Sequence, residues 1–199
     1  DTLLTVPLIG WTPKDRGRNC GFSISKYGTQ QDNDKQWWPD CGNGMQPDGK
    51  TYVTGNDPHD TSAEIGPDFV KEWIQYLVGR YGSARQGGVR FYDLDNEPML
   101  WMYTHRDVHP QPATYDEMQQ RTYAYASAVK QLDPDGQTLG PVLWGWNAYF
   151  YSALDTAQDQ WWNKSKPDRD AHGGIPFTDW YLQQMRSYEQ INGARILDY

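Results

Sequence analysis

The 199-residue chain has little positive charge and no long hydrophobic run. Lys and Arg number 18 against 26 Asp and Glu, which gives a net charge of −8. Nucleic-acid binding needs a basic face that displaces counterions, so this composition excludes a nucleic-acid partner. The longest apolar run, near residues 3–9, is far shorter than the roughly 18 residues that a membrane span needs. We therefore expect no membrane partner either.

Cysteine is also scarce, because Cys20 and Cys41 are the only two. They flank a segment rich in Gly, Asn, Asp and Gln. In a secreted protein this spacing suits a disulfide that closes a long loop, worth roughly 3 kcal/mol; two free thiols are the alternative. No neighbouring Cys or His completes a metal-ligand set. We expect a secreted, extracellular protein. The first residues have no basic stretch, so any signal peptide has been removed or lies outside this chain.

Aromatic residues, in contrast, are abundant. The chain has 10 Trp, 14 Tyr and 5 Phe, or 15% of its residues, although its mean hydropathy is −0.88. A chain this polar cannot use every ring in its core. We expect some rings to be exposed, where flat faces stack on ligands. Packing of the rings under long loops is the alternative.

Hydrophobic periodicity predicts strands and helices in alternation. The predicted strands are residues 3–9, 89–94, 138–143 and 195–199, and the predicted helices are residues 67–81, 114–132 and a third that carries Phe177, Trp180, Tyr181, Met185 and Tyr188. Pro67 in a first turn and the Thr114/Glu117 capping-box spacing mark two helix starts. This order implies right-handed βαβ units and a parallel sheet.

The loops of the predicted fold differ in length according to their place. Residues 11–66 and 144–174 follow strands and are long, whereas the connections from helix to strand are short. In a (β/α) barrel the loops after strands form the catalytic face. We therefore predict an α/β fold, a partial TIM-like (β/α)8 barrel with long βα loops, in one domain over residues 1–199. Four strands cannot close a barrel of eight, so an open α/β sheet is the alternative.

The predicted strand 89–94 runs into Asp95-Asn96-Glu97-Pro98. A glutamate at this strand end projects from the catalytic face, and Pro98 cannot extend the strand's hydrogen bonding. Hydrolysis of a glycosidic bond needs a carboxylic acid that protonates the leaving oxygen, with a second carboxylate opposite it. The tripeptide could be a mere turn. Its position, the aromatic residues behind it and the acidic composition favour Glu97 as a catalytic acid, with Asn96 bonding a sugar hydroxyl.

Several stretches together resemble glycoside hydrolase family 44. The resemblance rests on "YDLDNEPMLWMYTHRDVHP", "SAVKQLDPDGQTLGP", "NDPHDTS" and Gly145-Trp146, and it runs from "LLTVPLIGW" to "ARILDY". It implies a retaining endo-β-1,4-glucanase acting on cellulose-like β-glucans or xyloglucan, with a TIM-like barrel and a small β-sandwich. It implies Glu97 as the general acid/base, Asn96 as its hydrogen-bonding neighbour, and a monomer in the complete enzyme. A β-mannanase or xylanase is the runner-up, because Asn-Glu-Pro occurs across such barrels.

The chain departs from the family in one respect. The family's nucleophile is a second glutamate on a later strand, which would lie past position 199. The other glutamates are predicted in helices (Glu72, Glu117 and Glu189) or in a loop (Glu64). We therefore expect that the first and later barrel strands, the β-sandwich and the nucleophile lie outside this chain. The chain on its own would then be inactive. A non-catalytic glycan-binding fragment is the second hypothesis.

Further residues are candidates for substrate binding. The aromatic candidates for stacking on glucose rings are Trp101, Trp144 and Trp146, with core packing as the alternative. Tyr103 and His105, together with Arg106 and His109, should surround the cleft. Zinc at His105 and His109 is disfavoured by Pro110, so hydrogen-bonded His residues that organise the loop are expected. The pairs Trp37-Trp38 and Trp161-Trp162 would rim the cleft or cover the barrel edge.

No cofactor is required for the expected chemistry. Asp57 and Asp60 in "NDPHDTS" offer oxygen ligands for a structural calcium ion, which the family resemblance also allows. A solvated Asx turn accounts for the same residues. The expected partner is a β-glucan polysaccharide.

Overall fold

The computed structural model describes residues 2–157 and 165–199. At its centre lies a three-stranded parallel sheet of β1 (Thr2–Val6), β6 (Val89–Leu94) and β7 (Gln137–Leu139), in the order β1-β6-β7. The parallel sheet and the strand at 89–94 confirm the prediction. β1 is shorter than predicted because Pro7 has no N–H for the ladder, and β7 stops before Pro141 for the same reason.

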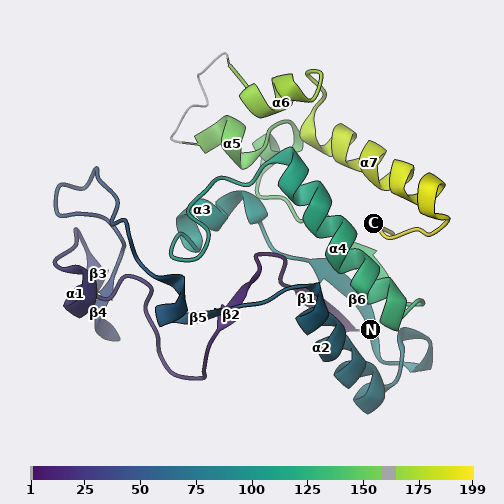
Figure 1. Cartoon of the computed structure of the whole chain (residues 1–199), viewed down its shortest axis with the longest axis horizontal. Helices are drawn as coiled ribbons and strands as arrows, with labels where there is room; N and C mark the ends of the chain where they lie inside the picture. Colours follow the sequence, from purple (N-terminus) through teal and green to yellow (C-terminus); the bar gives the residue numbers. More distant parts are fainter. Residues whose placement is uncertain (1, 158–164) are drawn as a thin grey trace.

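Helices cover one side of this sheet (Figure 1). They are α2 (Pro67–Tyr81), α4 (Tyr115–Leu132) and α7 (Phe177–Asn192), with α4 packed between the other two. As predicted, Pro67 opens α2, and the Thr114 side chain caps α4 by accepting a hydrogen bond from the Glu117 N–H. The capping satisfies a backbone donor that the first helical turn leaves without a partner.

The hydrophobic core fills the space between the sheet and these helices. Its largest fully buried side chains include Tyr92 and Leu94 of β6, Ile74 of α2, and Tyr115 and Tyr181 of the two longer helices. The opposite face of the sheet is open. Leu3 is 55% exposed and Thr5 is also exposed. The three strands are therefore part of a sheet with one covered face, and the described residues do not close a barrel.

The predicted strand 195–199 is wrong in its local structure, although this segment does lie beside β7. The backbone N–H groups of Asp198 and Tyr199 donate to the Thr138 carbonyl, and Gly140 N–H donates to the Tyr199 carbonyl. The Asp198 side chain, however, accepts the Thr138 N–H over 2.8 Å, where a strand would offer a backbone carbonyl. This side-chain bond replaces a regular ladder contact, so residues 195–199 stay irregular.

Residues 11–66, predicted as one long loop, contain short strands and helical turns, which corrects that prediction. They contain the antiparallel pair β2 (Trp11–Pro13) and β5 (Ser62–Glu64), and the pair β3 (Asn33–Asp34) and β4 (Trp38–Gly42). A short helix, α1 (Ile24–Tyr27), and the 3-10 turn η1 (Pro58–Asp60) complete the segment. Glu64, expected in a loop, ends β5. We call residues 20–56 the disulfide lobe; β3, β4 and α1 form its outlying part in Figure 1.

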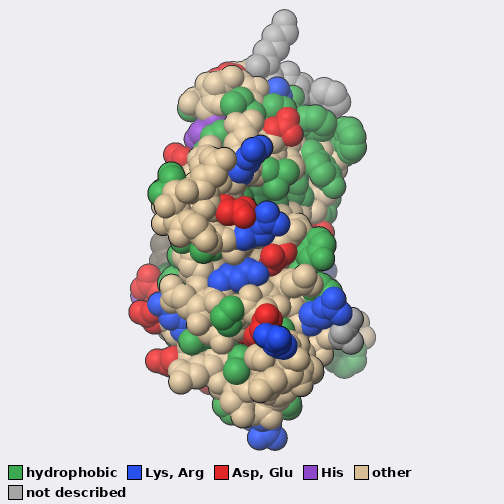
Figure 2. Space-filling model, turned by 90° about the vertical axis from the view of Figure 1, so that its right-hand side faces the viewer, with side chains coloured by type: hydrophobic (Ala, Val, Ile, Leu, Met, Phe, Trp, Pro, Cys, Tyr) green, Lys and Arg blue, Asp and Glu red, His purple; other side chains and the backbone are tan. Residues whose placement is uncertain are grey.

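Short elements connect these parts. They are η2 (Ala84–Gln86), η3 (Pro98–Leu100), α3 (Trp101–Thr104), η4 (Trp146–Tyr149), α5 (Ala153–Thr156) and α6 (Pro167–Ala171). Trp161 and Trp162 lie outside the described residues. Within the described ranges, no helix combines the length and apolar character needed to cross a membrane. Figure 2 shows basic and acidic side chains interspersed on one face of the molecule.

Candidate active site

The Asp95-Asn96-Glu97 turn lies at the carboxyl edge of the parallel sheet. It begins directly after β6, and the Asp95 N–H donates to the carbonyl of Val6 at the end of β1. The Glu97 N–H donates over 2.9 Å to the carbonyl of Val142, in the segment that follows β7. Main-chain bonds to both neighbouring strands' ends therefore hold Glu97 at this edge, where (β/α) enzymes carry their catalytic residues.

The backbone of this turn is unusual. Asp95 and Glu97 have φ values of 70° and 53° and are the non-glycine residues with positive φ in the described chain. For a residue with a side chain the left-handed region costs roughly 1–2 kcal/mol, less for Asp than for Glu. Such conformations persist where surrounding contacts determine them, and they gather at functional sites. Glu97 is half-buried and Asn96 is exposed, so both side chains can be reached from outside.

Asp95 is a residue that the sequence did not single out. It is 7% exposed, and its carboxylate accepts hydrogen bonds from the N–H groups of Leu8 and Ile9 and from the indole of Trp101. Burial, and after it the negative charge of Asp95, raises the pKa of Asp93, two residues earlier on β6. No local sequence signal shows this role, because the backbone donors to Asp95 come from residues 87 and 86 positions earlier.

A groove of about 480 Å³ reaches the turn on one side. Its lining includes Trp11, Asn19, Asp95, Asn96, Trp101 and His105. Of these, Asn96, Trp101 and His105 were predicted; Asn96 and His105 are exposed, and Trp101 is buried. Trp11 and Asn19 were not predicted, because their contribution depends on how β2 and the following residues fold back along the site. The groove mixes amides, an imidazole and indole rings, which suits a ligand with hydroxyl groups and flat apolar faces.

A second hollow, of about 190 Å³, lies beyond the turn. It is lined by Met99, Leu100, Tyr103, Trp144, Asn147, Ala148 and Thr156. Tyr103 is 47% and Trp144 is 46% exposed, so the structure brings these two predicted residues together with ring surface available. Trp146, 75% exposed, lies against Tyr149 and Phe150 instead. Since Asn96 lines the groove and Met99 lines this hollow, Glu97 lies in the chain between the two.

Trp101 is not an open stacking platform, which corrects the expectation. It is 1% exposed and belongs to the hydrophobic core, although it is one of the residues that line the groove. Its indole N–H donates to Asp95 over 3.0 Å, and the Arg121 guanidinium lies 5.4 Å from its ring centroid. A ring with both faces covered cannot stack on a sugar. Its part in the site is to hold Asp95.

His109 organises the loop through hydrogen bonding, as predicted. Its Nε2 lies 2.8 Å from Glu117 Oε1, and Arg121 Nε donates to the same oxygen over 2.8 Å. Burial raises the pKa of Glu117, but its hydrogen bonds and charge contacts with His109 and Arg121 outweigh burial and leave that pKa below its ordinary value. His105, by contrast, is exposed and faces the groove.

Arg106 connects the site to the disulfide lobe. Its guanidinium lies 4.4 Å from the Phe22 ring centroid and 4.2 Å from that of Tyr52, and it donates to the carbonyls of Val53 and Gly44. Gly44 has φ +73°, and a side chain there would collide with Arg106. Arg106 is 9% exposed, so it serves as an anchor for the lobe and not as a ligand contact.

Cys20 and Cys41 form a disulfide within the lobe, so the predicted disulfide is confirmed. The calcium alternative does not fit Asp57 and Asp60. Asp57 caps η1 by accepting the His59 N–H, and Asp60 pairs with Lys26, whose ammonium supplies the positive charge. Across residues 2–157 and 165–199, no group of three or more His, Cys, Asp or Glu side chains could hold a metal ion.

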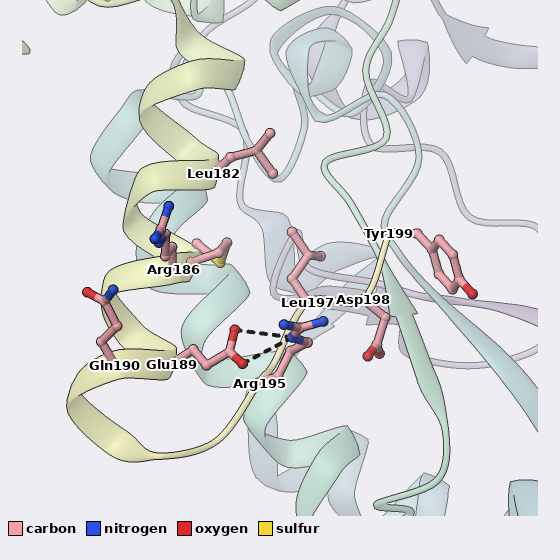
Figure 3. A pocket seen from close by; sticks show the side chains of 9 residues that line it. Leu182, Arg186, Glu189, Gln190, Arg195, Leu197, Asp198 and Tyr199 are labelled. Atoms are coloured by element: carbon pink, nitrogen blue, oxygen red, sulfur yellow. Dashed lines mark hydrogen bonds and ion pairs between the residues drawn. The ribbon is translucent and has the colours of Figure 1, made fainter.

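Another hollow, of about 580 Å³, lies elsewhere, between α7 and residues 195–199 (Figure 3). Its acidic groups are paired, Glu189 with Arg195 and Asp198 with Lys130. Asp95, Asn96 and Glu97 are not among its lining residues. Volume alone therefore does not mark the active site, and the Glu97 turn remains the candidate.

Comparison with known proteins decides the family. The model of glycoside hydrolase family 44 matches residues 1–199. The chain belongs to this family. It is 34% identical over 146 residues to β-mannanase/endoglucanase A of Caldicellulosiruptor saccharolyticus, and 33% identical over 142 residues to endoglucanase A of Paenibacillus lautus. These matches cover 70% and 71% of the chain but 10% and 19% of the two relatives.

Solved structures agree with this assignment. CelM2, a bifunctional glucanase-xylanase from a metagenome library, matches 98% of the chain with a TM-score of 0.93 and 41% identity. A Paenibacillus polymyxa family 44 xyloglucanase with xyloglucan also matches 98%, with a TM-score of 0.64 and 29% identity. The chain spans 38% and 34% of those two structures. It thus corresponds to about a third of each of these two structures.

Proposed function

We propose that this chain is the acid-bearing part of a retaining endo-β-1,4-glucanase that hydrolyses cellulose-like β-glucans or xyloglucan. One observation carries the proposal. Glu97 lies at the carboxyl edge of the sheet, in the chain between a polar groove that Asn96 lines and an aromatic hollow that Tyr103 and Trp144 line. A polysaccharide that passes along this edge would meet the hydroxyl-binding groups of the groove and the ring faces of the hollow.

In the proposed reaction, Glu97 donates its proton to the glycosidic oxygen while a carboxylate attacks the anomeric carbon from the other face. The leaving sugar departs with that proton, and a glycosyl-enzyme ester remains. Glu97, now ionised, then takes a proton from the water that hydrolyses the ester. The exposed Asn96 amide bonds a sugar hydroxyl near the reacting carbon. This mechanism needs two carboxyl groups about 5–5.5 Å apart.

The second carboxylate is proposed to come from outside these residues. Glu117 is occupied by His109 and Arg121. Asp95 is buried and accepts four hydrogen bonds. Neither is free to attack a sugar. We accordingly propose that the whole protein completes a TIM-like barrel around this edge, acts as a monomer, and is secreted, the last supported by the Cys20–Cys41 disulfide. The chemistry requires no cofactor.

A second activity, on β-mannan or xylan, is favoured by the relatives. One relative's name pairs mannanase with endoglucanase, and CelM2 is a glucanase-xylanase. All these substrates are β-1,4-linked chains that differ in ring substituents. Exposed rings such as Trp144 bind the flat faces that they share. We propose the glucanase activity as the main one.

The test uses the full-length protein and its Glu97→Gln variant. Reducing-sugar release is measured on xyloglucan, carboxymethylcellulose, mannan and xylan, with Glu72→Gln, at an exposed position on α2, as the matched control. We expect Glu97→Gln to lower turnover on the order of 100-fold or more, with polysaccharide binding retained, and Glu72→Gln to match the wild type. Full activity of Glu97→Gln would refute the acid role. Binding without turnover in the wild type would favour the glycan-binding alternative.

A further inference from the structure

We propose that Asp95 is a positioning residue. It holds the Glu97 carboxyl in the orientation that proton transfer to the glycosidic oxygen needs. This inference rests on the proposed acid role of Glu97. Asp95 does not touch the substrate in this proposal. It acts through the backbone of the Asp95-Asn96-Glu97 turn, and its loss should affect the proton transfer that Glu97 performs more than it affects folding.

The contacts of Asp95 divide between its two carboxylate oxygens. Oδ2 accepts the N–H groups of Leu8 over 2.6 Å and Ile9 over 3.2 Å, from the segment that follows β1. Oδ1 accepts the Asn96 N–H over 2.8 Å and the Trp101 indole N–H over 3.0 Å. One side chain therefore joins three segments: the end of β1, the peptide that leads into Glu97, and the helix α3 that follows it.

These four hydrogen bonds occupy all the acceptor sites of the Asp95 carboxylate. A carboxylate offers about four lone-pair sites on its two oxygens, and all four donors here lie within 3.2 Å. Asp95 is also 7% exposed. A saturated and buried carboxylate cannot attack an anomeric carbon or donate a proton, so its place next to Asn96 indicates positioning and not reaction.

The partners of Asp95 are themselves held in place. The peptide of Leu8 is bound from both sides, because its N–H donates to Asp95 and its carbonyl accepts from Arg121. The Arg121 guanidinium also lies over the Trp101 ring at 5.4 Å, and Glu117 of the same helix bonds Arg121. Trp101 is 1% exposed. Asp95 is thus connected, through Leu8 and Trp101, to Arg121 of α4.

The conformation of the turn explains why such a tie is needed. Asp95 and Glu97 both have positive φ, at 70° and 53°. A residue other than glycine keeps this backbone conformation only where surrounding contacts hold it. The Asn96 peptide between them has its N–H fixed by Asp95 Oδ1. When this bond is lost, the turn can relax, and the Glu97 carboxyl moves relative to the glycosidic oxygen. A displacement of about 1 Å can cost on the order of 100-fold in rate.

The experiment compares Asp95→Asn with a matched control, Asp133→Asn, in the full-length protein. An amide has a single acceptor oxygen, so Asp95→Asn leaves two of the four donors facing an NH2 group. Asp133 is also a buried carboxylate that accepts backbone and side-chain donors, from Ala84 and Tyr92. Asp133 follows α4, at the end of the sheet opposite the Glu97 turn. Asp133→Asn therefore measures how much stability is lost when a buried carboxylate of this kind is replaced by an amide.

The readout is kcat/KM on two substrates, measured well below both variants' unfolding temperatures. Xyloglucan needs protonation of its leaving oxygen, whereas an aryl cellobioside with a dinitrophenolate leaving group does not. We expect Asp95→Asn to lose roughly 10- to 100-fold on the polysaccharide and less than about threefold on the aryl substrate. Asp133→Asn should keep both values within about twofold. An equal loss of Asp95→Asn on both substrates would overturn the positioning role.

Two further variants keep the test decisive. Trp101→Phe removes one donor to Asp95 and keeps an aromatic ring at this position. It should therefore show the same substrate-dependent loss of kcat/KM at a smaller size, even if Asp95→Asn fails to fold. Unchanged activity on xyloglucan in Trp101→Phe and in Asp95→Asn would refute the inference. Glu97→Gln, run beside them, separates the two proposals. If it stays active, the acid role fails; if only Asp95→Asn stays active, the positioning role alone fails.

Discussion

The backbone N–H of Glu97 donates a hydrogen bond to the carbonyl oxygen of Val142 over 2.9 Å. This bond joins the turn after β6 to the segment after β7, so Trp144, two residues further on, lies on the same edge as the acid. Trp144 and Tyr103 line one hollow there. The relationship explains how residues about 40 positions apart in the chain come to line one hollow.

Removal of either ring should weaken glycan binding. Tyr103→Ala or Trp144→Ala deletes a half-exposed ring face, for which a loss of about 1 kcal/mol, or roughly fivefold in Kd, is expected. Calorimetric titration of the full-length protein with cello-oligosaccharides measures this. The matched control is Tyr76→Ala on α2, whose ring is 59% exposed on the helical side of the sheet. An equal loss in Tyr76→Ala would remove the case for Tyr103.

How far the sequence predicts this molecule depends on the range of the contacts involved. The helices at residues 67–81 and 115–132 follow from apolar spacing and from end signals such as Pro67 and Thr114. The place of Glu97 follows from the end of strand β6. These features depend on neighbours within a few residues, so local sequence patterns predict them.

Other features depend on partners far away in sequence. Asp95 receives its donors from Leu8 and Ile9, 87 and 86 positions earlier, and no local pattern shows that pairing. Trp101 follows a strand end like the exposed Trp144, yet its indole turns inward to Asp95. The disulfide lobe has strands of two and five residues, too short for a periodic signal.

Arg106 should control how firmly the disulfide lobe is attached. Arg106→Ala removes two hydrogen bonds to buried carbonyls and the contacts with Phe22 and Tyr52. We expect a loss of about 2–4 kcal/mol in the free energy of unfolding or of lobe opening. Arg106→Lys should restore little of it, because an ammonium cannot reproduce the planar fork. Urea unfolding and limited proteolysis within residues 20–56 measure the two effects.

The control for this prediction is Arg195→Ala. Arg195 pairs with Glu189 on the surface, where the side chains are 61% and 39% exposed, and such pairs are worth roughly 0–1 kcal/mol. If Arg106→Ala proves as mild as Arg195→Ala, the guanidinium does not anchor the lobe.

Glu117 should make the protein sensitive to acid. Its pKa is lowered from the ordinary 4.5, since the effects of His109 and Arg121 outweigh burial. A lowered folded-state pKa contributes stability that is present above the unfolded value and lost as the pH falls through the folded value. Free energies of unfolding from urea titrations at pH 6, 5, 4 and 3 should therefore fall less steeply for Glu117→Gln than for the wild type. Parallel curves would show that this carboxylate does not contribute to acid sensitivity.

Reduction of the Cys20–Cys41 disulfide should loosen the lobe and leave the sheet intact. The bond closes a loop with a sequence separation of 21 residues, for which the chain-entropy model gives a stabilisation of about 3 kcal/mol. Cys20→Ser/Cys41→Ser should therefore raise amide hydrogen exchange within residues 20–56. Exchange in α4 and α7, which pack on each other away from the lobe, serves as the internal control. Faster exchange in these helices as well would show that the lobe is part of the global folding unit, and Arg106 would then be the contact that joins the two.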